Sequence, residues 1–153
     1  MEKYHFNNTI KGNRMSFIKY LSLIILIIIV LMIIFPKINF RPMPPGLCEG
    51  KLPEKMPNWV SSLVPDTDAH YIKPLSITSL PIIAKYIEKC GTKIHITNMD
   101  NSNLFAYRQS PVFNFTDWIC IRADGHVSAS ATMGYSDLGK NREWVTMIQN
   151  QCS

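Results

Sequence analysis

The first pattern along the chain is a long apolar run near its N-terminus. Residues 17–35 read FIKYLSLIILIIIVLMIIF, with one lysine, one tyrosine and one serine near the start. These 19 residues would span roughly 28 Å as a helix, close to the hydrocarbon thickness of a bilayer. The run is long for a cleaved signal peptide, and no small-x-small cleavage site follows it. The pattern therefore predicts an uncleaved transmembrane signal anchor from Phe17 to Phe35.

Basic residues around this run predict its orientation. Four of them precede or open the run, namely Lys3, Lys11, Arg14 and Lys19. Lys37 and Arg41 follow it, so the excess lies on the N-terminal side and favours a cytoplasmic N-terminus. We therefore expect a cytoplasmic arm over residues 1–16 and a single pass through a bacterial inner membrane. The C-terminal domain would then lie in the periplasm, with the lipid bilayer as the first partner of the chain.

Proline is frequent in the next segment, residues 36–57. Proline fixes φ and lacks an N–H donor, so this segment is expected to be an extended tether to a soluble domain over residues 58–153. Within that domain the stretch HYIKPLSI, His70–Ile77, is a candidate first strand. Pro74 would restrict it to the edge of a sheet.

Helical spacing appears next, in SLPIIAKYIEKCG. One buried face would carry Leu80, Ile83, Ala84, Ile87 and Cys90. The preceding serine is a candidate N-cap, a proline falls in the first turn, and the final glycine suits the C-terminal cap.

Period-two patterns then predict a meander of strands, beginning with TKIHIT and LFAYRQ. The following stretch, residues 112–133, is a hairpin around Asp124-Gly125. A two-residue loop would place Ile121 opposite Ser128, whereas a three-residue loop places it opposite Val127. We prefer the longer loop because it gives one continuous apolar face, which a one-residue slip would destroy. The opposite face would carry Trp118, Cys120, Arg122, His126, Ser128, Ser130 and Thr132.

A second helix is expected over residues 136–152, with its apolar stripe at Leu138, Val145, Ile148 and Cys152. The element order is then β-α-β-β-β-β-α. It predicts a two-layer α+β domain with an antiparallel sheet of four to five strands and two helices. Two helices suffice to cover one face of such a sheet, so we expect the face that carries Trp118 to be open.

Composition excludes some classes of partner and cofactor. Residues 1–35 hold four Lys/Arg and one Glu, a net charge of +3, which leaves only +2 of the total +5 for residues 36–153. Nucleic-acid binding would need a basic stripe on the folded domain, and none is visible. The four cysteines form no C-x-x-C and the histidines lack ligand spacing, so neither a metal nor another cofactor is expected. Cys90 and Cys152 each close a predicted helix and could pair; the alternative is four unpaired thiols.

The stretch GYSDLGKNR, Gly134–Arg142, offers two interpretations at the start of the last helix. Ser136 and Asp137 can accept hydrogen bonds from its unpaired amide groups. Alternatively, these amides and Arg142 could hold an anion. Because Asp137 would compete with that anion, the capping interpretation is preferred. Asp117 is a second unusual acid, since it falls on the apolar face of the hairpin, where a bulge or a backbone amide could accommodate it.

Four motifs occur together in this chain: PNWVSS at Pro57–Ser62, HYIKPL at His70–Leu75, F-x-F-x-D at Phe113–Asp117, and GYSDLGKNR. In this order they resemble the family called domain of unknown function 1499, small bacterial and plastid proteins that are often membrane-attached. The resemblance covers Pro57–Cys152. The family has no established activity, so the resemblance implies a domain and not a reaction.

The chain also departs from the family pattern at several positions. The family has a basic residue at both ends of an R-S-A-S-R run, where this chain has Ser128 and Thr132. Trp59 stands in place of a cysteine, and Cys120 in place of an acidic residue. These departures weaken any charge-based site on that sheet face.

Three functions remain as hypotheses. The leading one is a non-enzymatic periplasmic module that binds an envelope protein or component through the open sheet face and the Asn58–Ser62 loop. The second is an envelope hydrolase, although no G-x-S-x-G elbow occurs and no catalytic residue is assigned. Its site would comprise His70, Asp137, Asn141 and Arg142. The third is a carrier of a small apolar ligand between helices and sheet. The candidate binding residues are Asn58, Ser61, His70, Trp118, Tyr135, Ser136, Asp137, Asn141 and Arg142.

Overall fold

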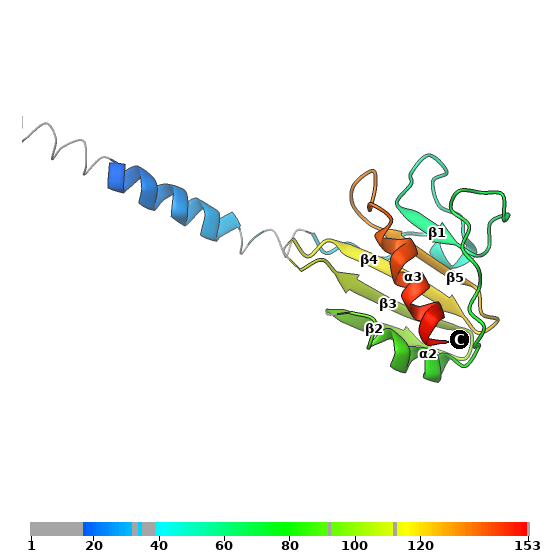
Figure 1. Cartoon of the computed structure of the whole chain (residues 1–153). Coiled ribbons are helices and arrows are strands. Elements are labelled where there is room, and N and C mark those ends of the chain that lie inside the picture. Colours follow the sequence, from blue (N-terminus) through cyan, green and yellow to red (C-terminus); the bar gives the residue numbers. More distant parts are fainter. Residues whose placement is uncertain (1–16, 32–33, 35–38, 92, 112, 153) are drawn as a thin grey trace, which may run out of the picture. The chain divides into compact units, whose positions relative to one another are not determined.

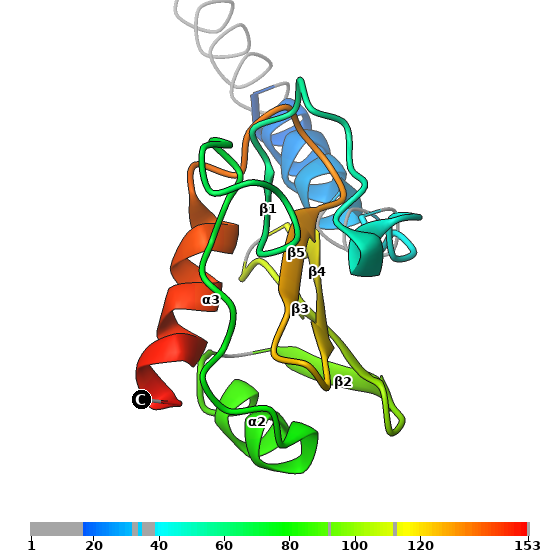
Figure 2. The ribbon, with the colours of Figure 1, turned by 90° about the vertical axis from the view of Figure 1, so that its right-hand side faces the viewer.

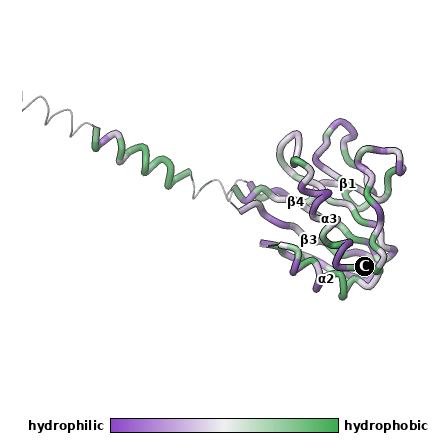
Figure 3. The backbone as a smooth tube through the Cα atoms, in the orientation of Figure 1, coloured by the Kyte–Doolittle hydropathy of each residue, from purple (hydrophilic) through white to green (hydrophobic). Residues whose placement is uncertain are grey.

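The computed structural model describes residues 17–31, 34, 39–91, 93–111 and 113–152. The chain divides into two compact units, Met1–Ile38 and Asn39–Ser153. In the first unit, residues 17–31 are helical, and the hydropathy colouring of Figure 3 marks this helix as predominantly apolar. Among the described residues, no helix combines the length and apolarity that a membrane span requires. Positions 1–16, 32, 33 and 35 of the predicted arm and anchor lie outside the described residues.

The second unit is a two-layer α+β domain, as the sequence predicts. Its antiparallel sheet has the strand order β1-β5-β4-β3-β2. Both helices lie on one face of this sheet (Figures 1 and 2). The elements are β1 (Trp59–Ser61), α2 (Leu80–Ile87), β2 (Ile94–Met99), β3 (Asn103–Gln109), β4 (Thr116–Arg122), β5 (Val127–Ala131) and α3 (Lys140–Gln151), preceded by the 3-10 turn η1 (Leu47–Glu49).

The first strand lies earlier in the chain than His70–Ile77, so that prediction is wrong. β1 pairs with β5 through Val60 opposite Ala129, and all three of its residues are buried. From the predicted stretch, only Tyr71 forms an isolated bridge, to Ser61. The short, fully buried β1 shows no alternating pattern, which is why the sequence did not reveal it.

The hairpin has the predicted three-residue register. Ile121 lies opposite Val127 and Ile119 opposite Ala129. Gly125 has φ +87°, a backbone conformation that favours glycine, and a Cβ there would lie only 2.8 Å from the carbonyl oxygen of Leu75. Both the backbone conformation and the lack of space therefore require glycine.

The core lies between the sheet and the two helices. It includes the fully buried side chains of Ile83, Ile87, Leu104, Ile119, Ile121, Trp144, Val145 and Ile148. The predicted helix faces are confirmed, with one exception. Leu138 is 88% exposed and has φ +56°, because α3 begins two residues later, at Lys140.

Residues 39–57 pack onto the domain and do not form the expected extended tether. We call this segment the strap. Its 3-10 turn η1 lies on the sheet face away from the helices (Figure 2). Leu47, in this turn, is fully buried in a cluster with Trp118 and Cys120. Trp118 is only 7% exposed, and its ring N–H donates to the carbonyl oxygen of Arg41 at 2.9 Å. The sheet face that was expected to be open is therefore covered.

A disulfide fastens the strap to the sheet, between Cys48 and Cys120. Cys90 and Cys152 are free and buried, so neither their pairing nor a set of four thiols is correct. Burial raises the pKa of Cys90, and the nearby Cys152 raises it further. Because the strap was interpreted as an extended tether, Cys48 had no predicted neighbour.

Candidate functional site

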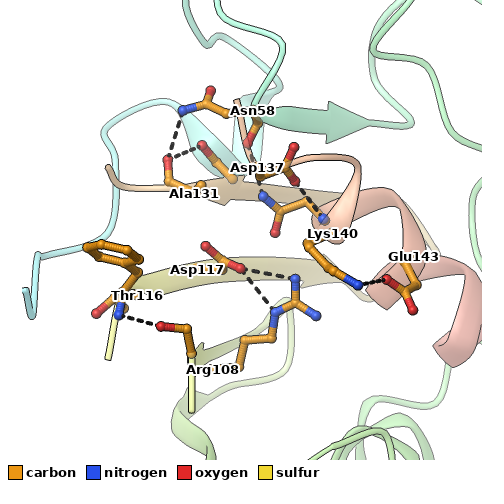
Figure 4. Close-up of polar contacts among 12 residues, drawn as sticks. Asn58, Arg108, Thr116, Asp117, Ala131, Asp137, Lys140 and Glu143 are labelled. Atoms are coloured by element: carbon orange, nitrogen blue, oxygen red, sulfur yellow. Dashed lines mark hydrogen bonds and ion pairs between the residues drawn. The ribbon is translucent and has the colours of Figure 1, made fainter. Parts of the chain in front are cut away.

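The residues before α3 form a helix cap, as the preferred interpretation of GYSDLGKNR predicts. One carboxylate oxygen of Asp137 accepts from the amide of Asn141 at 2.6 Å, and the other accepts from Gly139 at 3.1 Å. The Ser136 hydroxyl accepts from the amide of Leu138 at 3.1 Å. Figure 4 shows Asp137 turned back towards the helix. Both Asp137 oxygens are thus used locally.

Asn58 and Asn141 link β1, β5 and α3. The Asn141 side chain is fully buried and donates to the carbonyl oxygen of Asn58 at 3.0 Å. The Asn58 side chain donates in turn to the carbonyl oxygen of Gly134 at 2.9 Å and lies near that of Ala131 (Figure 4). These two predicted binding residues are buried connectors, since their hydrogen bonds hold the backbone at the start of α3.

His70 is held on three sides. Its ring stacks on Trp59 with centroids 3.9 Å apart and planes 7° from parallel. Nδ1 lies 2.7 Å from a carboxylate oxygen of Asp68, and Nε2 lies 3.1 Å from the carbonyl oxygen of Met56. Hydrogen bonds from the amide and ring of His70 hold the pKa of Asp68 below its ordinary value.

The structure does bring together three of the four residues of the predicted hydrolase site. His70, Asp137 and Arg142 line one cavity of about 120 Å³. Arg142, however, donates to the carbonyl oxygens of Ala69 and Tyr71, each at 2.7 Å. With His70 and Asp137 also bonded, the polar groups of this small cavity already have protein partners. The arrangement holds the loop of residues 68–71 against α3 and leaves few polar groups available to bind or activate a substrate.

The remaining predicted site residues are dispersed. The buried Ser61 hydroxyl lies 2.7 Å from that of Ser128 on the neighbouring strand. Tyr135 is 69% exposed, and Trp118 lies beneath the strap. The Ser62 hydroxyl contacts Nδ1 of His126 at 3.1 Å, but it also accepts from the amide of Val127 at 2.8 Å and so joins the residue after β1 to β5.

A larger cavity, of about 430 Å³, lies between the sheet and the ends of the two helices. Its lining joins apolar groups to several polar ones. It comprises Cys90, Gly91, Ile94, Arg108, Gln109, Ser110, Pro111, Asp117 and Lys140. Of these residues, Asp117 could be recognised from the sequence as an unusual acid, whereas Arg108 and Lys140 had no predicted function.

Arg108 and Asp117 form the charged centre of this cavity. They are directly opposite each other on β3 and β4, and both side chains are less than one-fifth exposed. Nε and Nη2 of Arg108 donate to the same oxygen, Oδ2, at 3.1 and 3.0 Å (Figure 4). The guanidinium also lies 4.6 Å from the ring centre of Trp144. Within the described part of the chain, the other oxygen, Oδ1, has no hydrogen-bond donor.

Opposing effects act on the ionisation of Asp117. Burial raises the pKa of its carboxyl group above the ordinary value, the Arg108 guanidinium lowers it, and the Asp137 charge raises it. Burial prevails, so the pKa of Asp117 is raised despite the ion pair. This acid thus lies in a largely buried site beside a cation.

Lys140 adds a second cation at the rim of the cavity. Its ammonium group donates to Glu143 at 2.7 Å, and both side chains are more than half exposed (Figure 4). An ammonium group has three donors, so this contact leaves others available. Arg108 likewise has N–H groups beyond the two that bind Oδ2. The cavity can therefore hold a molecule with an acceptor-rich head and a small apolar body. Among the described residues, no three His, Cys, Asp or Glu side chains converge closely enough for a metal ion.

Comparison with known proteins identifies the family of the domain. The model of the family described as "Protein of unknown function (DUF1499)" matches residues 52–151. The chain therefore belongs to this family, as the four motifs suggest. No curated protein and no solved structure matches the chain. The matched range includes Arg108, Asp117 and Lys140 but begins after Cys48, so one half of the disulfide lies outside it.

Proposed function

We propose that this protein is a membrane-anchored periplasmic module that binds a small anionic molecule without catalysis. Residues 17–35 form the anchor in this proposal. The large apolar side chains of the helical residues 17–31 are 43% to 68% exposed, which suits contact with lipid better than contact with water. The Cys48–Cys120 disulfide supports a location outside the cytoplasm, because disulfides persist in oxidising compartments.

The binding proposal rests on the ion pair in the larger cavity, whose two side chains still have hydrogen-bonding groups available for a ligand. Arg108 and Asp117 are held in place by each other and by Trp144, yet both retain unused hydrogen-bonding capacity towards about 430 Å³ of space. With Lys140, the cavity lining holds two cations and one carboxylate. A carboxylate-bearing ligand with a short apolar body matches this balance.

The alternative functions have less support. Binding of an envelope protein through the Trp118 face would require the strap to leave the sheet. A hydrolase at His70 would need polar groups that are already engaged in holding the 68–71 loop. Of the three hypotheses, the carrier of a small ligand between helices and sheet therefore has the most suitable site, with the ligand now assigned a negative charge.

A titration with three related probes tests this proposal. Benzoate, benzamide and benzylamine share one ring and differ in charge. In the full chain reconstituted in lipid nanodiscs, benzoate should shift the amide NMR signals of Gly91 and Lys140, whereas benzylamine should leave them unchanged. Arg108→Gln should weaken benzoate binding at least tenfold, because it removes the less exposed of the two cations in the cavity lining.

Two further variants separate binding from folding. Lys140→Gln alters an exposed side chain and should weaken benzoate binding severalfold while leaving the fold intact. Arg122→Gln removes an arginine that is paired with Asp124 away from this cavity, and it should leave binding unchanged. If benzylamine binds as well as benzoate, or if Arg108→Gln binds normally, the assigned ligand class is wrong.

Membrane attachment has its own test. The full chain should stay in the membrane pellet after washing with sodium carbonate at alkaline pH, because a predominantly apolar segment of 19 residues would have to leave the bilayer for release. Recovery of the intact chain in the supernatant would show that the anchor is wrong and would leave the cavity proposal standing.

A further inference from the structure

Two phenylalanines of the F-x-F-x-D motif have no role in the core or in the cavity. Phe113 is 52% exposed and Phe115 is 38% exposed, and their rings stack with centroids 5.5 Å apart. Phe40, at the start of the strap, is 47% exposed and meets Tyr107 edge-on at 5.4 Å. Neighbouring apolar side chains on the surface of a domain mark interaction sites, whereas single exposed ones are normal.

The turn that presents the two phenylalanines is tightly bonded. Ser110 and Phe115 are joined by two hydrogen bonds, from the Ser110 amide to the Phe115 carbonyl oxygen at 2.9 Å and from the Phe115 amide to the Ser110 hydroxyl at 3.0 Å. The Lys93 ammonium group donates to Pro111 and to the Asn114 side chain, the latter at 2.7 Å. These bonds tie Ser110 and Pro111 to Asn114 and Phe115, while the rings of Phe113 and Phe115 lie at the surface.

The same turn is bound to the residue at which the domain begins. The side chain of Asn39 is 2% exposed and donates to the carbonyl oxygen of Phe113 at 2.6 Å. The carbonyl oxygen of Asn39 accepts from the Thr116 hydroxyl at 3.2 Å. Phe40, Phe113 and Phe115 thus lie around the point where the chain enters the second unit.

Covalent geometry limits how far this point can lie from the proposed anchor. Only three residues separate Phe35 from Asn39, so four extended steps reach at most about 14 Å. The interfacial layer on each side of the hydrocarbon core is about 5–8 Å thick. Lys37 and Arg41 flank Asn39, and basic residues next to a span are attracted to anionic headgroups.

We propose that Phe40, Phe113 and Phe115 form a membrane-docking edge that enters the interface of the bilayer in which the chain is anchored. This inference rests on the anchoring part of the proposed function and deepens it. Phenylalanine rings are favourable at the boundary between headgroups and acyl chains, and the hydrogen bonds between Ser110 and Phe115 restrain the segment that carries two of them. Ser110 and Pro111 belong both to this turn and to the lining of the larger cavity, so docking would place the cavity beside the membrane surface.

Fluorescence quenching by brominated lipids tests the docking edge in the full, reconstituted chain. Phe113→Trp and Phe115→Trp each add an indole at the edge. Met99→Trp adds one at the end of β2, opposite Leu104 near the start of β3, whereas the two phenylalanines follow the end of β3. Met99 is 43% exposed, comparable with the two phenylalanines. The native tryptophans are buried and common to all variants, so the signal above wild type reports the added ring.

We expect lipids brominated near the headgroup to quench the added fluorescence at positions 113 and 115 at least threefold more than at position 99. Equal quenching at all three positions, or none at 113 and 115, would overturn the docking edge. Release of the chain by carbonate washing would instead overturn the anchor. Retention of the chain without quenching at 113 and 115 would exclude docking and leave the anchor intact.

Discussion

Asp68 and Asp117 lie in environments that act on their carboxyl groups in opposite directions. Hydrogen bonds from His70 lower the pKa of Asp68, whereas burial raises the pKa of Asp117. A lowered carboxyl pKa adds stability above its unfolded value, near 3.8, and this stability is lost as pH falls through the folded value. A raised pKa adds stability below the unfolded value, which is lost as pH rises through the folded value.

The two acids should therefore change the pH dependence of stability with opposite sign. Asp68→Asn should flatten the rise of the unfolding free energy with pH between about 3 and 5, and Asp117→Asn should steepen it. Urea denaturation at several pH values measures both slopes. The same change of slope in both variants would contradict these assignments. Asp66→Asn, an exposed aspartate two residues before Asp68, is the control for loss of a carboxylate.

A second prediction at the scale of single residues concerns Asn141. Its side chain is fully buried and joins α3 to the backbone of Asn58, so Asn141→Ala should lower the unfolding free energy by about 2 kcal/mol. Asn150→Ala, on the exposed side of the same helix, should change it by less than about 0.5 kcal/mol. Thermal and urea denaturation of both variants gives the comparison. Equal losses would show that the Asn58 contact contributes nothing specific.

Local chemistry decided which of these residues could be predicted from sequence. The cap formed by Asp137 depends on amides two to four residues away, and it was predicted correctly. The pairing of Arg108 with Asp117 depends on the register between β3 and β4. The sequence of β3 did not reveal which of its faces is buried, so Arg108 had no assigned neighbour. Asp117 could be recognised only as an acid without a partner.

At the scale of elements, the strap and its disulfide are the main departure from a simple two-layer domain. The disulfide joins residues 72 positions apart, so it restricts the unfolded chain considerably. Cys120→Ala should lower the unfolding free energy by about 4 kcal/mol by the loop-entropy relation. It should also expose Trp118, whose contacts are made largely by the strap. Acrylamide quenching of tryptophan fluorescence, together with urea denaturation, measures both effects.

Cys90→Ala is the matched control, since it removes a buried thiol that forms no disulfide. It should cost about 1 kcal/mol through lost packing and leave Trp118 inaccessible to acrylamide. If Cys120→Ala were no less stable than Cys90→Ala, the disulfide would contribute nothing to the free energy of unfolding. The apolar contacts of the strap alone would then hold it on the sheet.

Elements with a periodic pattern were predicted well, and those without one were not. The faces of α2 and the hairpin register followed from repeated apolar spacing. The strap has no such period, because its prolines prevent a long helix or strand and, of its residues, only Asn39 and Leu47 are buried. Its position depends on Cys120, more than seventy residues away, and no local rule identifies that partner.

At the scale of the whole molecule, the disulfide and the proposed orientation depend on each other. The Cys48–Cys120 bond should form only if the domain reaches an oxidising compartment. Orientation, in turn, should follow the basic residues at positions 3, 11, 14 and 19. Replacing these four by glutamine should therefore leave the domain in the cytoplasm and all four cysteines reduced. A reporter that is active only in the periplasm, fused after Ser153, should lose its activity at the same time.

The cysteines themselves provide the measurement. In denaturant without reductant, the wild-type chain should take up two maleimide-linked polymer groups, at Cys90 and Cys152, and four after reduction. The charge variant should take up four in both cases. Glutamine at the exposed Lys73, Lys85 and Lys89, which lie well after the anchor in the sequence, should leave the wild-type pattern. If the charge variant lost reporter activity and still took up only two groups without reductant, the disulfide would form in the cytoplasm and would no longer support a periplasmic domain.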